Sequence, residues 1–265
     1  MIILSCNVRA STMANDLGPA SWKERRELCL NVIKSRNPDI FCLQECSAEQ
    51  FEHFTDFFNS DYDVFWISPY PDFDAPENAI FYRKGKFKVI TFGGYHLSPT
   101  PHIVNASCFG DGCNRVANYI VFETAQKLRF RLLNTHLSVA AQSALPQAKM
   151  LIEDANAWNE KLPQILVGDL NSAYNSEVIQ LLLGTFRDSY DEATGIKNER
   201  FTCHDFLGEA YKDSENFAFP GKIDWILIKG NIRCSKSEII MDHDGNIYPS
   251  DHYFIAAELI FSDSQ

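Results

Sequence analysis

Short apolar runs, each about as long as one β-strand, recur at even intervals along the chain, and this spacing constrains the fold more than any other feature. They lie at residues 2–7, 39–43, 64–67, 79–82, 87–92, 119–123, 128–134, 165–167, 223–228 and 254–261. Helical periodicity is less frequent and covers residues 21–36, 47–58 and 142–160. The sequence contains no repeat, low-complexity tract or linker. We therefore expect one α/β (α+β) domain over residues 1–265, a four-layer sandwich of two packed mixed β-sheets flanked by helices.

Two of the expected helices begin with the sequence pattern of a capping box. Ser21 is followed three residues later by Glu24, and Ser47 is followed by Gln50. In this motif each side chain accepts a hydrogen bond from a backbone N–H group that the first helical turn leaves unpaired. Both serines are therefore predicted to be N-caps.

Composition and charge exclude several classes of protein. Hydrophobic residues make up 45% of the 265 positions, which excludes a disordered chain. The formal net charge of −11 argues against binding nucleic acid by general electrostatic attraction, although a local basic groove would still allow it. We find no apolar stretch of the ~18 residues that a membrane span needs, and no signal peptide. We expect a cytoplasmic monomer.

The eight cysteines do not follow the pattern of a disulfide-rich or zinc-binding protein. No pair has the Cys-x₂-Cys spacing that supplies half of a structural zinc site. Cys108 and Cys113 bracket a short loop and could pair in an exported protein. Reduced thiols in a cytosolic protein are the favoured interpretation.

Six of the apolar segments are joined to a polar cluster that a core would not need. The clusters are Asn7, Gln44-Glu45, Asn134-Thr135-His136, Gly168-Asp169-Leu170-Asn171, Lys222-Ile223-Asp224 and Ser250-Asp251-His252. Each has an ordinary explanation by itself, such as a solvated turn or, for Asp169 and Asn171, an Asx-turn. As a set they predict a polar site at one edge of the layered sheets.

The motifs Leu43-Gln44-Glu45, Gly168-Asp169-Leu170-Asn171 and Ser250-Asp251-His252, in this order, form a specific signature. With them the chain resembles, over nearly its whole length, the endonuclease/exonuclease/phosphatase family of deoxyribonuclease I-like metal-dependent phosphoesterases. The segments Trp22-Lys23-Glu24-Arg25-Arg26 and Asn78-Ala79-Ile80-Phe81-Tyr82-Arg83 are similar to a bacterial branch of mostly unassigned substrate. The resemblance implies two mixed sheets packed face to face, in agreement with the layered fold.

The resemblance implies a Mg²⁺ site, with Mn²⁺ as a substitute, in which Glu45 is the principal ligand. Asn7 would help to place both the metal and the phosphate, and Asp251 would contribute on the metal side. Asp169 would activate the attacking water, and Asn171 would hydrogen-bond to the phosphoryl group. Mg²⁺ takes one or two carboxylates and keeps several waters, so these residue types suit it.

The resemblance also implies two catalytic histidines, each oriented by a carboxylate. His252 would donate to a non-bridging phosphate oxygen, with Asp224 as its partner. His136 would be the second histidine, with Glu77 orienting it in the same way. Arg115 matches a family arginine that contacts the substrate phosphate, although a solvated arginine at a strand start is the alternative.

His204 lies in a Phe-Thr-x-His segment where the family carries a substrate loop, so it is a candidate substrate-binding residue. A surface histidine with no such role is the alternative.

Three functions remain from the sequence. The first is a Mg²⁺-dependent phosphoesterase that acts on a small or lipid-linked phosphoester, and the net charge favours it. The second is a DNA or RNA nuclease, which needs a basic groove with aromatic side chains. The third, a non-catalytic binding module on the same fold, is disfavoured by the intact set of polar residues.

Overall fold

The computed structural model describes residues 1–69, 76–110, 112, 114–158, 162–197, 200–215 and 217–261. Twelve strands form two six-stranded mixed sheets. The first sheet has the order β11 (Ile232–Ile240), β12 (Phe254–Phe261), β1 (Ile2–Asn7), β2 (Ile40–Gln44), β4 (Ile80–Arg83) and β3 (Tyr62–Phe65). The second has the order β5 (Lys88–His96), β6 (Val116–Glu123), β7 (Arg129–His136), β8 (Gln164–Asp169), β10 (Asp224–Lys229) and β9 (Arg187–Asp188). The predicted two-sheet fold is confirmed.

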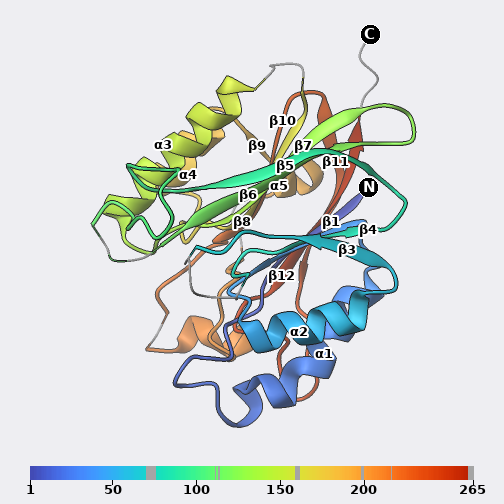
Figure 1. The fold of residues 1–265 in the computed structure, drawn as a ribbon. Coiled ribbons are helices and arrows are strands. Elements are labelled where there is room, and N and C mark those ends of the chain that lie inside the picture. The colour runs from blue at the N-terminus through green and yellow to red at the C-terminus, as the bar shows by residue number, and fades with distance from the viewer. Residues whose placement is uncertain are drawn as a thin grey trace.

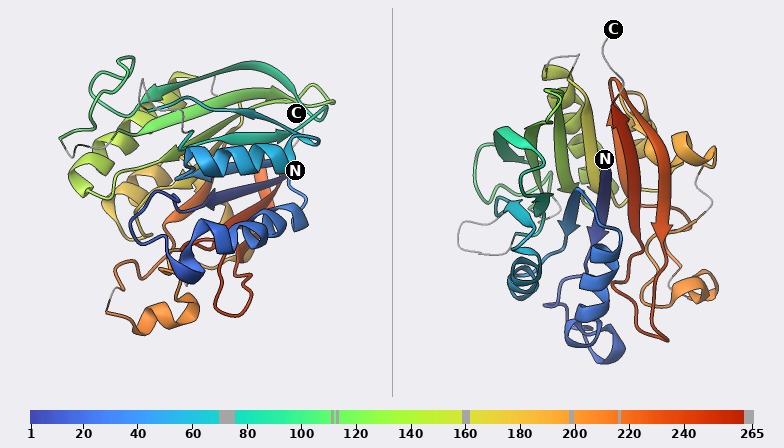
Figure 2. Two further views of the ribbon diagram at one scale, coloured as in Figure 1. Left: turned by 60° about the horizontal axis from the view of Figure 1, so that its bottom comes forward. Right: turned by 90° about the vertical axis from the view of Figure 1, so that its right-hand side faces the viewer.

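Helices cover the outer face of each sheet (Figures 1 and 2). Helices α1 (Trp22–Ser35) and α2 (Ala48–Phe58) pack on the first sheet. Helices α3 (Ala141–Ala157) and α4 (Glu177–Leu183) pack on the second. The short helix α5 (Ser189–Thr194) lies against β11, and two 3-10 turns span Gly18–Ala20 and Gly208–Asp213. The chain thus forms four layers.

The alternation of apolar residues along the strands explains these layers. In β1, Ile3 points into the core between the two sheets, where it joins Ile165 and Ile226 of the second sheet. The next residue, Leu4, points the other way into the core under α1 and α2. Successive side chains in a strand alternate between faces, so a strand buried on both faces reads as a continuous apolar run.

The two predicted capping boxes have different outcomes. Ser47 and Gln50 form the expected reciprocal bonds at the start of α2. Ser21 is the N-cap residue of α1 as predicted, but no capping box forms there, because its Oγ donates to the carbonyl of Gly18 instead of accepting from α1. Asp16 lies in the loop before α1, and its carboxylate accepts a hydrogen bond from the backbone N–H of Trp22 at 3.0 Å. The carboxylate also places negative charge at the positive end of the α1 dipole.

The third helix ends at Ala157, and residues 159 and 160 of the predicted span 142–160 lie outside the described residues. Cys113 also lies outside them, so the favoured prediction of reduced thiols and the alternative of a Cys108–Cys113 pair both stay untested. Among the described residues, no helix is long and apolar enough to cross a membrane.

Candidate functional site

Strand register brings the polar clusters to one edge of both sheets. In the first sheet β1 and β2 are parallel, and Asn7 lies opposite Gln44, the residue before Glu45. In the second sheet β7 and β8 are parallel, and His136 lies opposite Asp169. The antiparallel strand β10 places Asp224 on the other side of Asp169. Because parallel strands end at the same edge, residues far apart in sequence meet there.

Three residues just beyond these strand ends have a left-handed backbone. The φ angles are 52° for Arg9, 56° for Glu45 and 47° for Asn171. This region is uncommon for residues other than glycine, and such conformations gather at functional sites. Here each one turns the chain sharply at the sheet edge, beside the candidate site.

Gly168 allows strands β7 and β8 to approach closely beside the site. A Cβ atom at this position would lie 1.8 Å from the carbonyl oxygen of Thr135, which is its neighbour in the ladder. A backbone atom cannot move aside as a flexible side chain can. Glycine is therefore required immediately before Asp169.

The side chain of Asn7 joins the two candidate carboxylates. Its Nδ2 donates to Glu45 Oε1 at 3.0 Å and to Asp169 Oδ2 at 2.9 Å. Its Oδ1 accepts from the Arg9 N–H at 3.0 Å. All polar atoms of the amide are thus engaged, and its orientation is fixed by the turned backbone at Arg9.

Glu45 is charged at neutral pH. Burial alone would raise its pKa, but the charged His252, the hydrogen bond from Asn7 and Arg9 oppose burial, and the pKa is lowered. An ionised carboxylate beside a second carboxylate is an oxygen donor set of the kind that hard divalent cations prefer.

Asp169 is almost fully buried, and two of its neighbours hold it in place. Its Oδ1 accepts from the Asn171 N–H at 2.8 Å, so the expected Asx-turn is present within the site. Burial and the nearby Asp224 carboxylate raise the pKa of Asp169 to about 7, against the opposing influence of His252. A carboxyl group with a pKa near the working pH is suited to act as a general base.

His252 and Asp224 form a buried pair. His252 Nδ1 lies 2.8 Å from Asp224 Oδ2, and its Nε2 lies 3.9 Å from Asp169 Oδ2. Burial would lower the pKa of His252, but the Asp224 carboxylate more than offsets it and holds the pKa well above the usual value. With Nδ1–H donated to Asp224, the Nε2–H group faces the centre of the site. This is the pairing predicted from the sequence.

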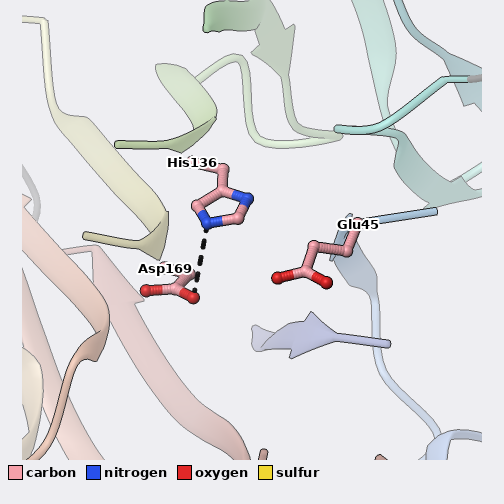
Figure 3. Close-up of side chains that lie close together, drawn as sticks. All are labelled: Glu45, His136 and Asp169. Carbon is pink, nitrogen blue, oxygen red and sulfur yellow. Dashed lines mark ion pairs between the residues drawn. The ribbon is translucent and has the colours of Figure 1, made fainter. Parts of the chain in front are cut away.

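His136 lies beside Asp169, and Figure 3 shows these two side chains together with Glu45. Its Nε2 is 3.6 Å from Asp169 Oδ2 and 2.9 Å from the Asn171 amide. Its Nδ1 accepts from Arg115 Nη1 at 3.0 Å, because a guanidinium group can only donate. Burial and the Arg115 charge lower the pKa of His136 well below its usual value, so the ring is neutral.

The structure places Arg115, rather than Glu77, beside Nδ1 of His136. Glu77 lines a cavity beside the site together with Arg115 and His136. Burial raises the pKa of its carboxyl group, against the effect of Arg115. The sequence could not distinguish these two residues as partners, because both lie in segments that reach the site from other strands.

A cavity of about 300 Å³ opens beside these groups and has the size of a small-molecule site. Its polar and charged lining consists of Arg9, Thr12, Glu45, Ser47, Glu77, Arg115 and His136. Arg9 was not among the predicted site residues, although its position two residues after Asn7 was the available signal. Arg9 Nη1 also lies 3.4 Å from Asp251 Oδ2.

Two groups of side chains have the spacing of metal ligands. Glu45, His136 and Asp169 form one, and Asp169, Asp224 and His252 form the other. The histidine nitrogens nearest these carboxylates already face Asn171 or Asp224, which leaves the carboxylate oxygens as the better donors. In addition, Asp224 Oδ1 is buried and has no hydrogen-bond partner among the described residues. The donor set therefore fits a hard divalent cation.

His204 is not placed in the cavity. It is fully buried, its ring stacks on Tyr253 with centroids 4.0 Å apart, and its Nδ1 accepts from the Gly208 N–H. Its segment still adjoins the site, since Cys203 forms a β-bridge with His252.

The chain is similar in sequence and in fold to known proteins. The probable CCR4-Not complex 3'-5'-exoribonuclease subunit Ccr4 of Encephalitozoon cuniculi is 26% identical over 89% of this chain. The chain spans 56% of that relative's length.

Two solved structures from Bacteroides share the fold. An endonuclease/exonuclease/phosphatase from Bacteroides vulgatus has a TM-score of 0.86 and 22% identity, covering 98% of each chain. The mannosyl-6-phosphatase of Bacteroides thetaiotaomicron has a TM-score of 0.84 and 22% identity, over 98% of this chain and 100% of its own.

The model of the Endonuclease/Exonuclease/phosphatase family matches residues 4–252, which include every strand end described above. Its members include nucleases and phosphatases, which are hydrolases of phosphoesters. On this match, the chain belongs to the endonuclease/exonuclease/phosphatase family.

Proposed function

We propose that this protein is a Mg²⁺-dependent phosphoesterase that hydrolyses a phosphomonoester or phosphodiester with water activated by Asp169. The observation that carries the proposal is the convergence of Asn7, Glu45, Asp169, Asp224 and His252 on one edge of both sheets. A binding module without catalysis has no need for a buried carboxylate poised near neutral pH beside a charged His–Asp pair.

Glu45 would be the principal metal ligand, with Asn7, which donates to Glu45, helping to place the metal and Asp251 contributing from the side of Arg9. When bound, Mg²⁺ would neutralise part of the phosphoryl charge. The assignment of Asp251 rests on its place beside the site, where it now pairs with Arg9.

The residues of the chain divide the remaining work. Asp169 accepts a proton from the attacking water, for which its pKa of about 7 is suitable. His252 donates from Nε2 to a non-bridging oxygen, and Asp224 keeps the ring oriented and charged. Fixed donors aimed at developing negative charge supply a large share of catalysis in such sites.

Asn171, His136 and Arg115 form a second group of donors around the phosphoryl position. Arg115 donates to Nδ1 of His136, and the Asn171 amide, which donates to the Leu137 carbonyl, lies beside Nε2 of the same ring. Arg115 lines the cavity and would bind a phosphate oxygen.

A small phosphoester is the favoured substrate class. The cavity of about 300 Å³ suits a small molecule, and the net charge of −11 disfavours a polyanion. A fold relative is a mannosyl-6-phosphatase, which supports this class. The second candidate is a nuclease, favoured by the relative described as an exoribonuclease subunit.

A substrate panel tests the proposal. Sugar phosphates, phosphorylated lipid headgroups, a generic phosphodiester and short RNA are incubated with Mg²⁺, and released phosphate or nucleotide is measured. We expect hydrolysis of at least one small phosphoester and its loss in Asp169→Asn, which keeps the side-chain shape. Hydrolysis of RNA alone would establish the nuclease. Equal rates for the wild type and Asp169→Asn would contradict the mechanism.

A further inference from the structure

Arg25 on helix α1 is a fully buried arginine whose charge is used mainly on backbone carbonyls. Its guanidinium donates to the carbonyls of Val8 at 2.7 Å, Arg9 at 2.7 Å, Ala20 at 2.8 Å and Pro249 at 3.0 Å. A buried charge is costly unless it is fully paired, so this cluster of acceptors indicates a specific role.

Three of these carbonyls, those of Val8, Arg9 and Pro249, belong to the two loops that carry the metal-side residues. Val8 and Arg9 directly follow Asn7, and Pro249 directly precedes Ser250-Asp251-His252. The Arg9 N–H in turn holds the Oδ1 of Asn7, whose Nδ2 joins Glu45 and Asp169. The guanidinium of Arg25 is thus connected to the candidate ligand Glu45 through three hydrogen bonds, by way of Arg9 and Asn7.

The aromatic contacts of Arg25 add a third loop. The guanidinium carbon lies 5.0 Å from the Trp22 ring centre and 5.6 Å from that of Phe206. Phe206 lies in the segment that begins at Cys203, and Cys203 bridges to His252. Trp22 and Arg25 come from the Trp-Lys-Glu-Arg-Arg segment, to which the proposed mechanism gives no role.

We propose that Arg25 is a positioning residue, which fixes the loop after Asn7 and the loop before His252 relative to each other and so sets the geometry of the metal site. A planar fork of five N–H donors can serve several carbonyls at once, whereas a lysine ammonium presents three donors on a single nitrogen. Lysine at position 25 retains the charge but cannot hold both loops.

Arg131 provides a matched control in the second sheet. It is also buried, lies 4.5 Å from the ring centres of both Tyr119 and Trp158, and pairs with Asp154 at 2.6 Å. Its contacts are with side chains under α3 and do not include a residue of the site. Arg131→Lys therefore reproduces the loss of a buried guanidinium without the proposed positioning role.

The experiment compares Arg25→Lys and Arg131→Lys in three measurements. These are Tm, the affinity for Mn²⁺ by calorimetry, and kcat and KM on a substrate that the wild type hydrolyses. We expect both variants to lower Tm, but only Arg25→Lys to weaken Mn²⁺ binding and reduce kcat at least about tenfold with little change in KM. For Arg131→Lys, the Mn²⁺ affinity and kcat should both stay within about twofold of the wild type.

Mn²⁺ affinity and kcat that stay within about twofold in Arg25→Lys would overturn the proposal. Equal losses of Mn²⁺ affinity and kcat in Arg25→Lys and Arg131→Lys, at equal Tm, would also overturn it. If Arg25→Lys does not fold, Phe206→Leu removes a ring from Arg25 and leaves its hydrogen bonds. It should lower kcat and Mn²⁺ affinity in the same direction, and unchanged values would overturn the proposal.

The kinetic measurement rests on the proposed function, whereas the Mn²⁺ measurement does not. A wild type that hydrolyses no substrate contradicts the proposed function, and the Mn²⁺ comparison then decides the role of Arg25 by the same two outcomes.

Discussion

His252 and Asp224 lie 28 residues apart and are joined by a 2.8 Å hydrogen bond from Nδ1 to Oδ2 that connects the two sheets of the molecule. Asp224 opens β10 in the second sheet, and His252 lies two residues before the start of β12 in the first. The pair therefore exists only when the sheets are packed together. Its place at the sheet edge makes the site a property of the whole fold.

Asp224 and His252 should act as one unit in catalysis. Asp224→Asn and His252→Ala should each reduce kcat by about 10²–10⁴-fold, because each removes the oriented, charged imidazole. The double variant should be little slower than the slower single variant, since the losses are shared. Rates of the three variants at one Mg²⁺ concentration check this. A double loss equal to the product of the single losses would show that the residues act independently.

His204 should make the folded protein less stable as the pH falls below 6.5. Burial, with a smaller effect of the charged His252, lowers the pKa of His204 to about 3, so the folded ring stays neutral while the unfolded ring binds a proton. The stability from this group is present above pH 6.5 and is lost between pH 6.5 and 3, by about 1.4 kcal/mol per pH unit. This stability arises because the folded protein accommodates the neutral imidazole of His204 better than the charged one.

Urea unfolding of the wild type and His204→Gln between pH 7 and 4.5 checks this prediction. The difference in unfolding free energy between the two proteins should shrink as the pH falls. A difference that is constant with pH would show that His204 takes up its proton equally in both states.

Gly168→Ala should destabilise the fold more than the backbone angle alone explains. Gly85 offers the matched control, because its φ is 71° and a Cβ atom there would meet nothing within 4 Å. Gly85→Ala should cost about 1–2 kcal/mol, the usual penalty of the left-handed region. Gly168→Ala adds a clash with the Thr135 carbonyl and should cost more than about 4 kcal/mol. Equal costs in denaturant unfolding would contradict the close approach of β7 and β8.

Nucleic acid should bind weakly and with little dependence on salt. A protein that grips many phosphates releases counterions, so its affinity falls steeply as salt rises. With a net charge of −11 we expect little binding to long duplex DNA. Fluorescence anisotropy between 50 and 300 mM salt measures this. Submicromolar binding to arbitrary DNA at physiological salt, lost as salt rises, would favour the nuclease.

The layered fold and most strands were predictable from the sequence, because their runs are buried on both faces. Strand β11 was missed, since it is an edge strand in which residues such as Arg233 and Lys236 are exposed. Helix α4 was also missed, because this short helix around Ile179 has too few residues to show helical periodicity. Helices and strands with little buried surface show only a weak pattern of apolar residues in the sequence.

The sequence predicted which residues form the site better than it predicted which of them contact each other. His252 and Asp224 are joined as the family resemblance implied. The partner of His136 is a different matter, since Arg115 reaches its Nδ1 from the start of β6, where Glu77 was expected. Likewise the side chain of Asp16, and not that of the N-cap residue Ser21, accepts a hydrogen bond from the first turn of α1. Such contacts depend on how loops from different strands fold back, which no local pattern records.

The response of hydrolysis to metal removal tests the central claim most directly. On a small phosphoester that the wild type hydrolyses, excess EDTA should abolish activity and Mg²⁺ should restore it. Glu45→Gln keeps the side-chain shape but removes the charged ligand, and should lower kcat at least about a hundredfold with the fold intact by circular dichroism. Hydrolysis that continues undiminished in EDTA, or a Glu45→Gln variant as active as the wild type, would contradict the account.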